Sequence, residues 1–373
     1  MKVLYVGQFN FPDKNPACIR VFSIAKILQK IGIEVEFLAF SNNTKDYSVD
    51  KIYDTFSCDY IALNGSIDKI RFYINGKQVV NKLKKGKYDA VIIYNYPALA
   101  SYTILKYCKK NNIKVLADLT EWYNPTGNII AKAIKTFDVN VRMNKINRHV
   151  DGIIAVSRYL AEYYKDFVET IVVPTFIYKE NTCEFVNPSD CVSIMFAGNV
   201  EKNFNKERLD VVVNAFKQRE RNMVLKICGV DKTVLEEKCG ALPQNVMVYG
   251  RVSHDECIKI LANSDFSIIP RETKINTIAG FPTKLSESFS VGVAVIATNV
   301  GDVCEYIVNG KNGYVLKECN EKSFSDLFGE LETLNIEQRV ALKRNVIELN
   351  RLTLDNFTQE MQDFFNNVLN RVV

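Results

Sequence analysis

The sequence predicts an α/β protein built from two tandem, doubly wound Rossmann-like domains. The chain has 373 residues, which is long for one hydrophobic core and ample for two domains of ordinary size. Short Val- and Ile-rich runs alternate with longer amphipathic segments, and this alternation restarts after Pro174. Continuous apolar strands of this kind are typical of a parallel sheet that is covered by helices on both faces.

The first half contains seven strand-like runs, and a first domain is expected over 1–177. Between the runs, the segments 17–31 and 97–110 carry apolar residues at helical spacing. The expected strands are 2–7, 35–40, 58–63, 89–94, 113–118, 152–156 and 170–174.

A polar stretch over 178–190 is the expected linker, and a second domain is expected over 190–354. The segment 355–373 has Phe357 and Phe364 at helical spacing, which predicts a C-terminal amphipathic helix. Completion of the first domain is one option for its docking. The strands expected in the second domain are 192–197, 223–228, 246–249, 266–269, 293–297 and 313–316.

The net charge of +5 is uneven, because residues 1–175 hold 25 Lys and Arg against 16 Asp and Glu. Lysines gather over 82–87 and 106–114. They are either solvated helix ends or a dock for anionic lipid headgroups or a lipid-linked acceptor. The sequence shows no export signal and no run long enough to span a bilayer. We therefore expect a cytoplasmic protein, with peripheral contact at the inner membrane face as an option and nucleic acid not among its partners.

The segment 279–287 is the most informative part of the chain. Gly280 allows a ligand to approach the backbone closely, and Pro282 suits the first turn of a helix. The amides at that helix start, together with Lys284, predict a site for an anion such as a diphosphate. Glu287 lies one turn beyond Thr283 on the same helical face, where its carboxylate can accept hydrogen bonds from two vicinal hydroxyls of a ribose.

In order and spacing, these segments resemble the GT-B glycosyltransferases of family 4, a large retaining group that includes bacterial exopolysaccharide and capsule enzymes. The resemblance covers nearly the whole chain. Its pieces are Gly7 with 12–21 and 32–35, then 151–160, 197–198, 227–229, 249–252, 279–287, 301–305 and 309–315. It implies two facing Rossmann-like domains, with the nucleotide-sugar donor bound by the second.

By that resemblance Glu287 is the ribose-binding glutamate of a paired-glutamate motif. The partner glutamate, eight residues earlier, is replaced by Ala279, which affects the contact to the donor sugar ring. The donor-binding residues are expected to be Gly7, Gly198, Lys202, Arg251, Gly280, Phe281, Pro282, Thr283, Lys284 and Glu287.

The family supplies an Arg and a Lys for the phosphates after the first strand of the second domain. Here Asn199 occupies the Arg position, and Lys202, Lys206 and Arg208 compete for the Lys role. Lys206 is favoured slightly by its distance from Ala215. Arg271 follows a strand end, where a guanidinium is suited to bidentate diphosphate contacts.

In the first domain, Asp118 and Glu121 follow the strand 113–118 and are expected to face the acceptor or the reacting sugar. A capped turn is the structural alternative. Trp122 could stack on a sugar or pack in the core, and His149 and His254 are expected to be structural or solvated. Asp118, Glu121, Lys206 and Arg271 are thus the catalytic candidates.

The sequence contains no Asp-x-Asp pair and no phosphate-binding glycine motif of dehydrogenases or P-loop enzymes. No metal or other cofactor is expected, because helix starts and basic side chains can stabilise the leaving charge. The expected function is transfer of a hexose from a UDP- or GDP-sugar to a glycan or lipid-linked oligosaccharide in cell-surface polysaccharide synthesis. A sugar-nucleotide epimerase of the same fold and a non-catalytic nucleotide-sugar-binding scaffold are the alternatives.

Overall fold

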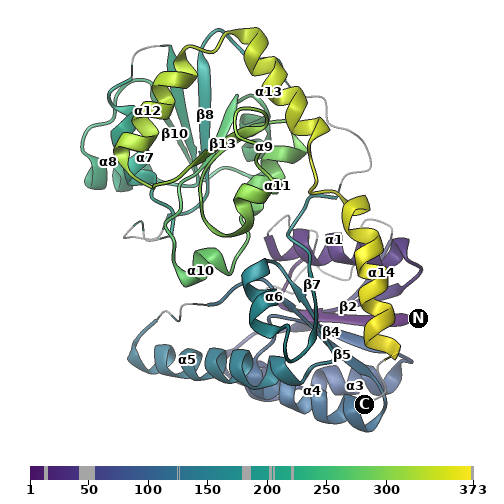
Figure 1. The fold of residues 1–373 in the computed structure, drawn as a ribbon. Helices are drawn as coiled ribbons and strands as arrows, with labels where there is room; N and C mark the ends of the chain where they lie inside the picture. Colours follow the sequence, from purple (N-terminus) through teal and green to yellow (C-terminus); the bar gives the residue numbers. More distant parts are fainter. Residues whose placement is uncertain are drawn as a thin grey trace. The chain divides into compact units, whose positions relative to one another are not determined.

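The protein divides into two compact units. A computed structural model describes residues 1–11, 16–41, 55–123, 125, 127–178, 186–200, 204, 206–219 and 222–370. Met1–Tyr178 and Thr353–Val373 form the first unit, and Lys179–Leu352 form the second. The chain thus leaves the first unit near the expected linker and returns to it at its C-terminal end (Figure 1).

The first unit contains a seven-stranded parallel sheet in the order β3-β2-β1-β4-β5-β6-β7. Strand β1 pairs in parallel with β2 on one side and β4 on the other, so the strand order reverses beside β1. In open sheets of this kind, ligands bind beyond the carboxyl ends of the strands at such a reversal. The strands are β1 Lys2–Gly7, β2 Glu34–Ser41, β3 Ser57–Ala62, β4 Ala90–Tyr94, β5 Lys114–Leu119, β6 Gly152–Ala155 and β7 Glu169–Val172.

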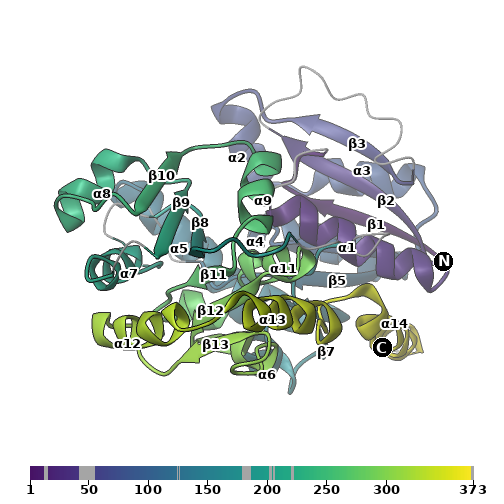
Figure 2. The same ribbon diagram turned by 90° about the horizontal axis from the view of Figure 1, so that it is seen from above.

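Helices cover both faces of this sheet. Helix α4 packs against α2, α3 and α5, and α14 packs against α1 and β7. Figures 1 and 2 show α3, α4 and α5 together on one face of the sheet and α1 on the other. The helices are α1 Pro16–Lys30, α2 Ser66–Ile74, α3 Lys77–Lys85, α4 Ala98–Lys110, α5 Ile129–Asn144, α6 Arg158–Tyr164 and α14 Leu354–Asn370, with a 3₁₀ turn at Ile146–His149.

The C-terminal helix α14 belongs to the first unit because its apolar stripe is buried there. Phe357 stacks on Phe176 with ring centroids 5.6 Å apart. Gly152 of β6 has no space for a side chain, since a Cβ would lie 2.7 Å from the ring of Phe364. An ion pair between Lys30 and Asp355 links α14 to α1. The expected amphipathic helix is therefore present, and it completes the first unit.

The second unit contains a six-stranded parallel sheet in the order β10-β9-β8-β11-β12-β13, which reverses between β8 and β11. Its strands are β8 Val192–Ala197, β9 Met223–Cys228, β10 Val246–Gly250, β11 Phe266–Ile269, β12 Ala294–Thr298 and β13 Gly313–Leu316. Its helices are α7 Leu209–Phe216, α8 Lys232–Cys239, α9 His254–Ala262, α10 Ile275–Ile278, α11 Thr283–Ser290, α12 Glu321–Glu332 and α13 Ile336–Glu348, with a 3₁₀ turn at Gly301–Glu305.

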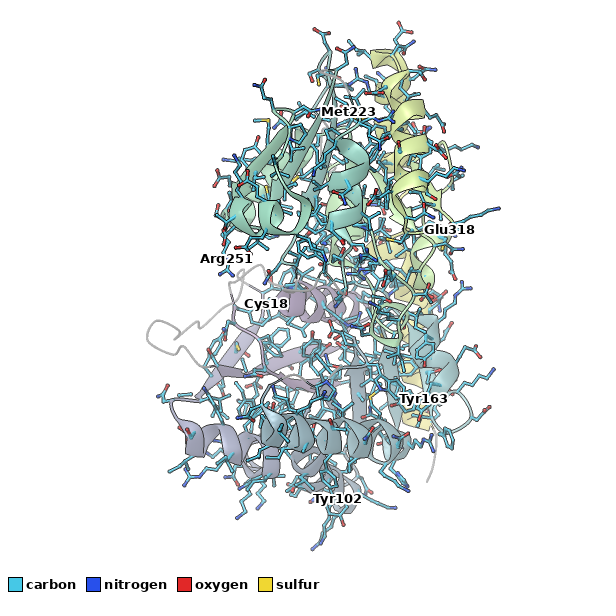
Figure 3. The ribbon with its side chains drawn as sticks, turned by 90° about the vertical axis from the view of Figure 1, so that its left-hand side faces the viewer. Cys18, Tyr102, Tyr163, Met223, Arg251 and Glu318 are labelled. Atoms are coloured by element: carbon cyan, nitrogen blue, oxygen red, sulfur yellow. The ribbon has the colours of Figure 1, made fainter. Side chains whose placement is uncertain are left out.

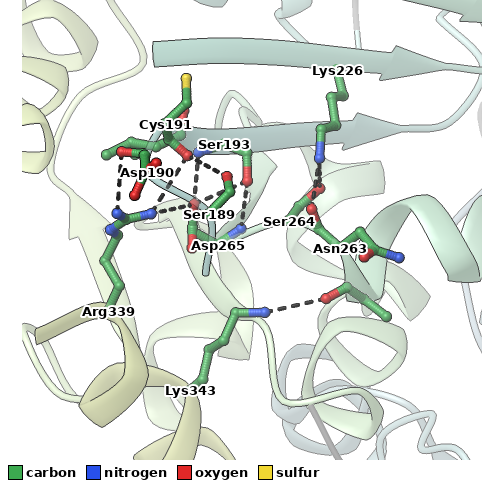
Figure 4. A network of polar contacts seen from close by, with 12 residues as sticks. Ser189, Asp190, Cys191, Ser193, Lys226, Asn263, Ser264, Asp265, Arg339 and Lys343 are labelled. Atoms are coloured by element: carbon green, nitrogen blue, oxygen red, sulfur yellow. Dashed lines mark hydrogen bonds and ion pairs between the residues drawn. The ribbon is translucent and has the colours of Figure 1, made fainter. Parts of the chain in front are cut away.

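A polar network fastens α13 to the amino ends of β8 and β11 (Figure 4). The Asp265 carboxylate accepts from the amide and the hydroxyl of Ser193, at 2.7 and 2.9 Å, and from Arg339 at 3.1 Å. Lys343 donates to the carbonyl of Ala262 at 3.2 Å, and burial lowers the pKa of Lys343 to about 8. These charges lie at the amino ends of the strands, where they hold α13 against the sheet (Figure 4).

The prediction of two Rossmann-like α/β domains is confirmed, and each expected strand lies within two residues of an observed one. Among the residues that the structure describes, no helix combines the length and the apolar character needed to cross a membrane.

Candidate active site

In the second unit, a glycine follows the carboxyl end of β8 and another follows that of β9. We call this pair, Gly198 and Gly229, the glycine ledge. Gly198 and Gly229 follow these neighbouring strands with φ angles of +147° and +91°, which L side chains rarely adopt. A Cβ at Gly229 would lie 2.6 Å from the carbonyl oxygen of Gly198. The two strand ends therefore pack backbone against backbone.

Beside this ledge lies a buried cluster of two cations and one carboxylate. Glu207 receives Arg271 Nε on Oε1 at 2.9 Å and pairs through Oε2 with Lys284 Nζ at 3.1 Å. Arg271 follows β11, and Lys284 lies in the first turn of α11, so the cluster forms where the strand order reverses. A Cβ on Gly198 would lie 2.8 Å from Lys284 Nζ, which places the ammonium directly over the ledge.

The cluster carries more positive than negative charge. Burial, reinforced by the nearby Arg271, lowers the pKa of Lys284 below its ordinary value, although Glu207 opposes that change. Burial alone would raise the pKa of Glu207, but Lys284 and Arg271 hold it below its ordinary value. An anion bound at Lys284 would relieve the excess positive charge.

The start of α11 lies at the same place and has no side-chain cap. Pro282 is the N-cap residue. The first amides of a helix have no partner within the helix, and they carry the positive end of its dipole. Phe281 is buried edge-to-face against Tyr306, with centroids 5.5 Å apart, which fixes the loop that leads into the helix. Gly280 and Ala279 are buried as well.

Glu287 lies one turn after Thr283, as expected, and its partner is His254, which was expected to be structural or solvated. The His254 Nε2 atom lies 3.4 Å from Glu287 Oε1. His254 is the first residue of α9, and the side chain of its N-cap, Ser253, accepts from the amide of Glu256. This cap positions the imidazole beside the carboxylate that the sequence analysis assigned to a ribose.

The expected phosphate ligands after β8 do not all reach this cluster. Lys202 lies outside the described residues. The Arg208 guanidinium is held by Asp210, 3.0 Å from its Nε, and by Glu272. Lys206 is half-buried, while its neighbour Glu207 points into the cluster. Arg251 is exposed beyond the carboxyl end of β10, at the opposite end of the sheet from Met223 (Figure 3).

In the first unit, Asp118 occupies a closed structural cluster. Its side chain is fully buried. Asp118 Oδ1 accepts from Arg20 Nε at 2.8 Å, and Oδ2 accepts from the Tyr5 hydroxyl at 2.5 Å. Arg20 also donates to the carbonyl of Val173 at 2.7 Å. This corrects the expectation that Asp118 faces an acceptor, because its oxygens are already occupied by a buried arginine and a buried tyrosine.

Two other candidates of the first unit, Gly7 and Trp122, have roles in packing. Gly7 ends β1, and a Cβ there would lie 2.9 Å from the Phe9 ring and from Tyr94. Trp122 packs edge-to-face on Tyr163, with centroids 5.0 Å apart. Glu121 is half-buried. Among the residues described, no group of three or more His, Cys, Asp or Glu side chains has the arrangement of a metal site.

Comparison with known proteins identifies a family match in the second unit. Residues 191–349 match the family model for glycosyl transferases group 1. An uncharacterised glycosyltransferase of Methanocaldococcus jannaschii is 25% identical over 206 residues, which are 54% of this chain. The match spans about half of that relative, 55% of its length.

Solved structures of similar fold cover nearly the whole chain. A glycosyltransferase from Rickettsia africae has a TM-score of 0.69 at 18% identity and covers 100% of this chain and 99% of its own. Sucrose-phosphate synthase from Thermosynechococcus elongatus scores 0.72 at 13% identity, with 99% of each chain covered. Anabaena HepE in complex with UDP and glucose scores 0.70 at 13% identity, covering 98% of this chain and 99% of its own.

The family match covers the region that contains the cluster, and the structural similarity covers the whole chain. Residues 191–349 match the glycosyl transferases group 1 model, and the whole chain shares the two-domain GT-B type of fold with solved glycosyltransferase structures.

Proposed function

We propose that this protein is a retaining glycosyltransferase that takes a sugar from a UDP- or GDP-sugar bound in its second unit. One observation carries the proposal: Lys284 lies over Gly198, at the uncapped start of α11, in a buried cluster with excess positive charge. A nucleoside diphosphate supplies the anion that such a cluster lacks.

In this mechanism, Lys284 and the first amides of α11 stabilise the charge that develops on the leaving diphosphate. Such preorganised donors act without reorganisation during the reaction, and removing one commonly costs about 10²- to 10³-fold in rate. Arg271 and Glu207 hold Lys284 in position rather than contacting the donor, because they occupy each other. Glu287 accepts from the ribose hydroxyls, and His254 orients it.

Acceptor and donor are brought together so that the leaving phosphate oxygen can take the acceptor's proton on the same face of the sugar. No protein nucleophile is then required, and holding the reactants in place supplies much of the acceleration. We propose that no metal takes part and that the transferred group is a hexose. The acceptor is a glycan or lipid-linked oligosaccharide in cell-surface polysaccharide synthesis. The UDP bound to Anabaena HepE supports UDP as the base to test first.

The test is donor recognition by purified protein. UDP or GDP, and then their hexoses, should raise the melting temperature in a thermal-shift panel. Glu287→Ala should raise the donor KM at least about tenfold, as expected for two lost hydrogen bonds to a charged group. Unchanged donor kinetics in this variant would refute the assigned role of Glu287.

A non-catalytic nucleotide-sugar binder is the alternative, and Ala279 in place of the family glutamate favours it. Binding of a UDP-sugar with neither hydrolysis nor transfer across a set of glycan acceptors would establish that alternative. Transfer with retained anomeric configuration, followed by NMR of the product, would establish the enzyme.

A further inference from the structure

Three neighbouring helices of the first unit expose apolar side chains at helical spacing. On α2, Ile67, Ile70 and Ile74 follow the pattern i, i+3, i+7, and Ile67 is 66% exposed. These positions repeat on one side of a helix, so they form a stripe. The opposite side of α2 contributes Phe72 to the core. In the part of the chain that the structure describes, the stripe is therefore exposed.

Helix α5 repeats this arrangement more strongly. Ile130, Ile134 and Phe137 follow the pattern i, i+4, i+7 and are 72%, 59% and 61% exposed. The buried side chains of α5 come from its second half, such as Val139 and Met143. The first half thus presents large apolar groups to solvent where a soluble surface would normally place polar ones.

Helix α4 packs against both helices that carry the stripes, α2 and α5. It exposes Leu99 and Tyr102, one turn apart. Figure 3 shows Tyr102 projecting away from the sheet of the first unit. The docking face is defined here by these residues: Ile67, Ile70, Ile74, Leu99, Tyr102, Ile130, Ile134 and Phe137.

The same helix layer is strongly basic. Helices α2, α3, α4 and α5 together contain twelve Lys and Arg, of which Arg142 is buried, while their acidic residues are Asp68 and Asp138. The whole chain carries a net charge of only +5. Lys132 and Lys135 are exposed between the apolar residues of α5. Lys82, one of the lysines that gather over 82–87, does not contribute free charge to this surface, because it pairs with Glu36 and Asp59.

We infer that the docking face binds the surface of an anionic lipid bilayer. Ile, Phe and Tyr side chains insert at the boundary between headgroups and acyl chains, while lysines pair with anionic headgroups. A second copy of the chain fits less well, because a symmetric contact would set two basic faces against each other. The inference deepens the proposed function and rests on it for its purpose, since it gives the surface that would bring the enzyme to a lipid-linked acceptor.

The test is co-sedimentation of the full chain with vesicles of phosphatidylcholine, with and without phosphatidylglycerol. We expect binding only when the anionic lipid is present, and binding should weaken as salt rises above about 0.1 M. Ile130→Ser/Ile134→Ser/Phe137→Ser should weaken vesicle binding at least about tenfold, and Lys132→Glu/Lys135→Glu by a similar factor. All five side chains are exposed, so folding should be unaffected, which circular dichroism would verify.

Matched controls lie in the second unit. Ile336→Ser and Lys317→Glu/Lys322→Glu change exposed side chains of the same kinds outside the docking face, and they should bind vesicles like the wild type. No binding to anionic vesicles, or an equal loss in controls and variants, overturns the inference. So does self-association in sedimentation velocity that the triple variant abolishes without any vesicle binding.

The donor assay keeps this inference separate from the proposed function. The triple variant should retain the thermal shift with the nucleotide that the wild type binds. Vesicle binding without any nucleotide binding would refute the proposed function and leave this inference standing. Nucleotide binding without vesicle binding would refute this inference and leave the proposed function standing.

Discussion

Each unit buries a cluster of charged side chains, and the two clusters differ in what they leave unsatisfied. In the first unit, Arg20 and Asp118 cancel each other, and Tyr5 takes the remaining carboxylate oxygen. In the second, two cations share Glu207. Burial of charge is common to both and therefore does not mark a site. Excess positive charge at the carboxyl ends of the strands does, because an anionic ligand bound there can neutralise it.

A buried lysine shows the same distinction within the second unit. Burial lowers the pKa of Lys343 to about 8, and it also lowers that of Lys284. Lys343 lies at the amino ends of the strands and donates to the Ala262 carbonyl. Lys284 lies over Gly198 at the carboxyl ends. A shifted lysine pKa becomes evidence of function only together with its place in the sheet.

The largest expected effect comes from breaking the neutral cluster. Asp118→Asn leaves the buried charge of Arg20 without a counter-charge, which should destabilise the first unit by about 3–5 kcal/mol. Urea denaturation followed by circular dichroism measures this loss. Arg20→Met/Asp118→Asn should recover part of it, because the unpaired charge is then absent. Full stability of Asp118→Asn with loss of transfer would instead return Asp118 to the active site.

Removal of Lys284 should lower transfer without lowering stability, which is the opposite of the effect expected for Asp118→Asn. Lys284→Met leaves Glu207 and Arg271 as a neutral pair, so the melting temperature should stay constant or rise. Transfer should fall about 10²- to 10³-fold in kcat/KM, since a preorganised donor to the leaving diphosphate is lost. Lys206→Met is the matched control and should behave much like the wild type. A larger loss in Lys206→Met than in Lys284→Met would reverse the assignment of the phosphate-binding lysine.

Part of this arrangement could be predicted from the sequence, and part of it could not. Strand positions were predictable because buried parallel strands are continuous apolar runs, and the helix start that carries Lys284 and Glu287 was predictable from its local sequence. Glu207 was not, since the polar run from Asn199 to Arg208 contains several charges of similar appearance. Its role depends on Arg271 and Lys284, which are distant in sequence.

Asp118 and His254 also show that a residue's position in the sequence does not identify the partner of its side chain. Asp118 was expected at the site because it lies near a strand's carboxyl end, but Arg20, 98 positions earlier, occupies it. His254 was expected to be structural or solvated, yet it lies against Glu287, 33 positions later. Local patterns indicate where chemistry can occur, whereas partners from other elements decide whether a side chain is available for it.

The excess charge predicts a pH dependence that the neutral cluster lacks. Because the pKa of Lys284 is lowered in the free protein, a bound diphosphate should raise it and binding should take up a proton. UDP affinity should therefore fall as pH rises through the free-state pKa, by up to about tenfold per pH unit until the pKa of the complex is reached. Calorimetry in buffers of different ionisation enthalpy measures the proton uptake. Lys284→Arg keeps the charge at every accessible pH and should remove this dependence, whereas a dependence that persists in it belongs to another group.

The smallest expected effect concerns the histidine beside Glu287. His254→Gln keeps a donor near the carboxylate and should change the donor KM by less than about threefold. His254→Ala removes it and should raise KM by about three- to tenfold, the cost of one hydrogen bond to a charged group. In both variants kcat should stay near the wild-type value, because His254 acts only through the orientation of Glu287 and is a positioning residue. In Glu287→Ala, the further change His254→Ala should then have no additional effect on the donor KM. An additive loss in this double-mutant cycle would mean that His254 contacts the donor itself.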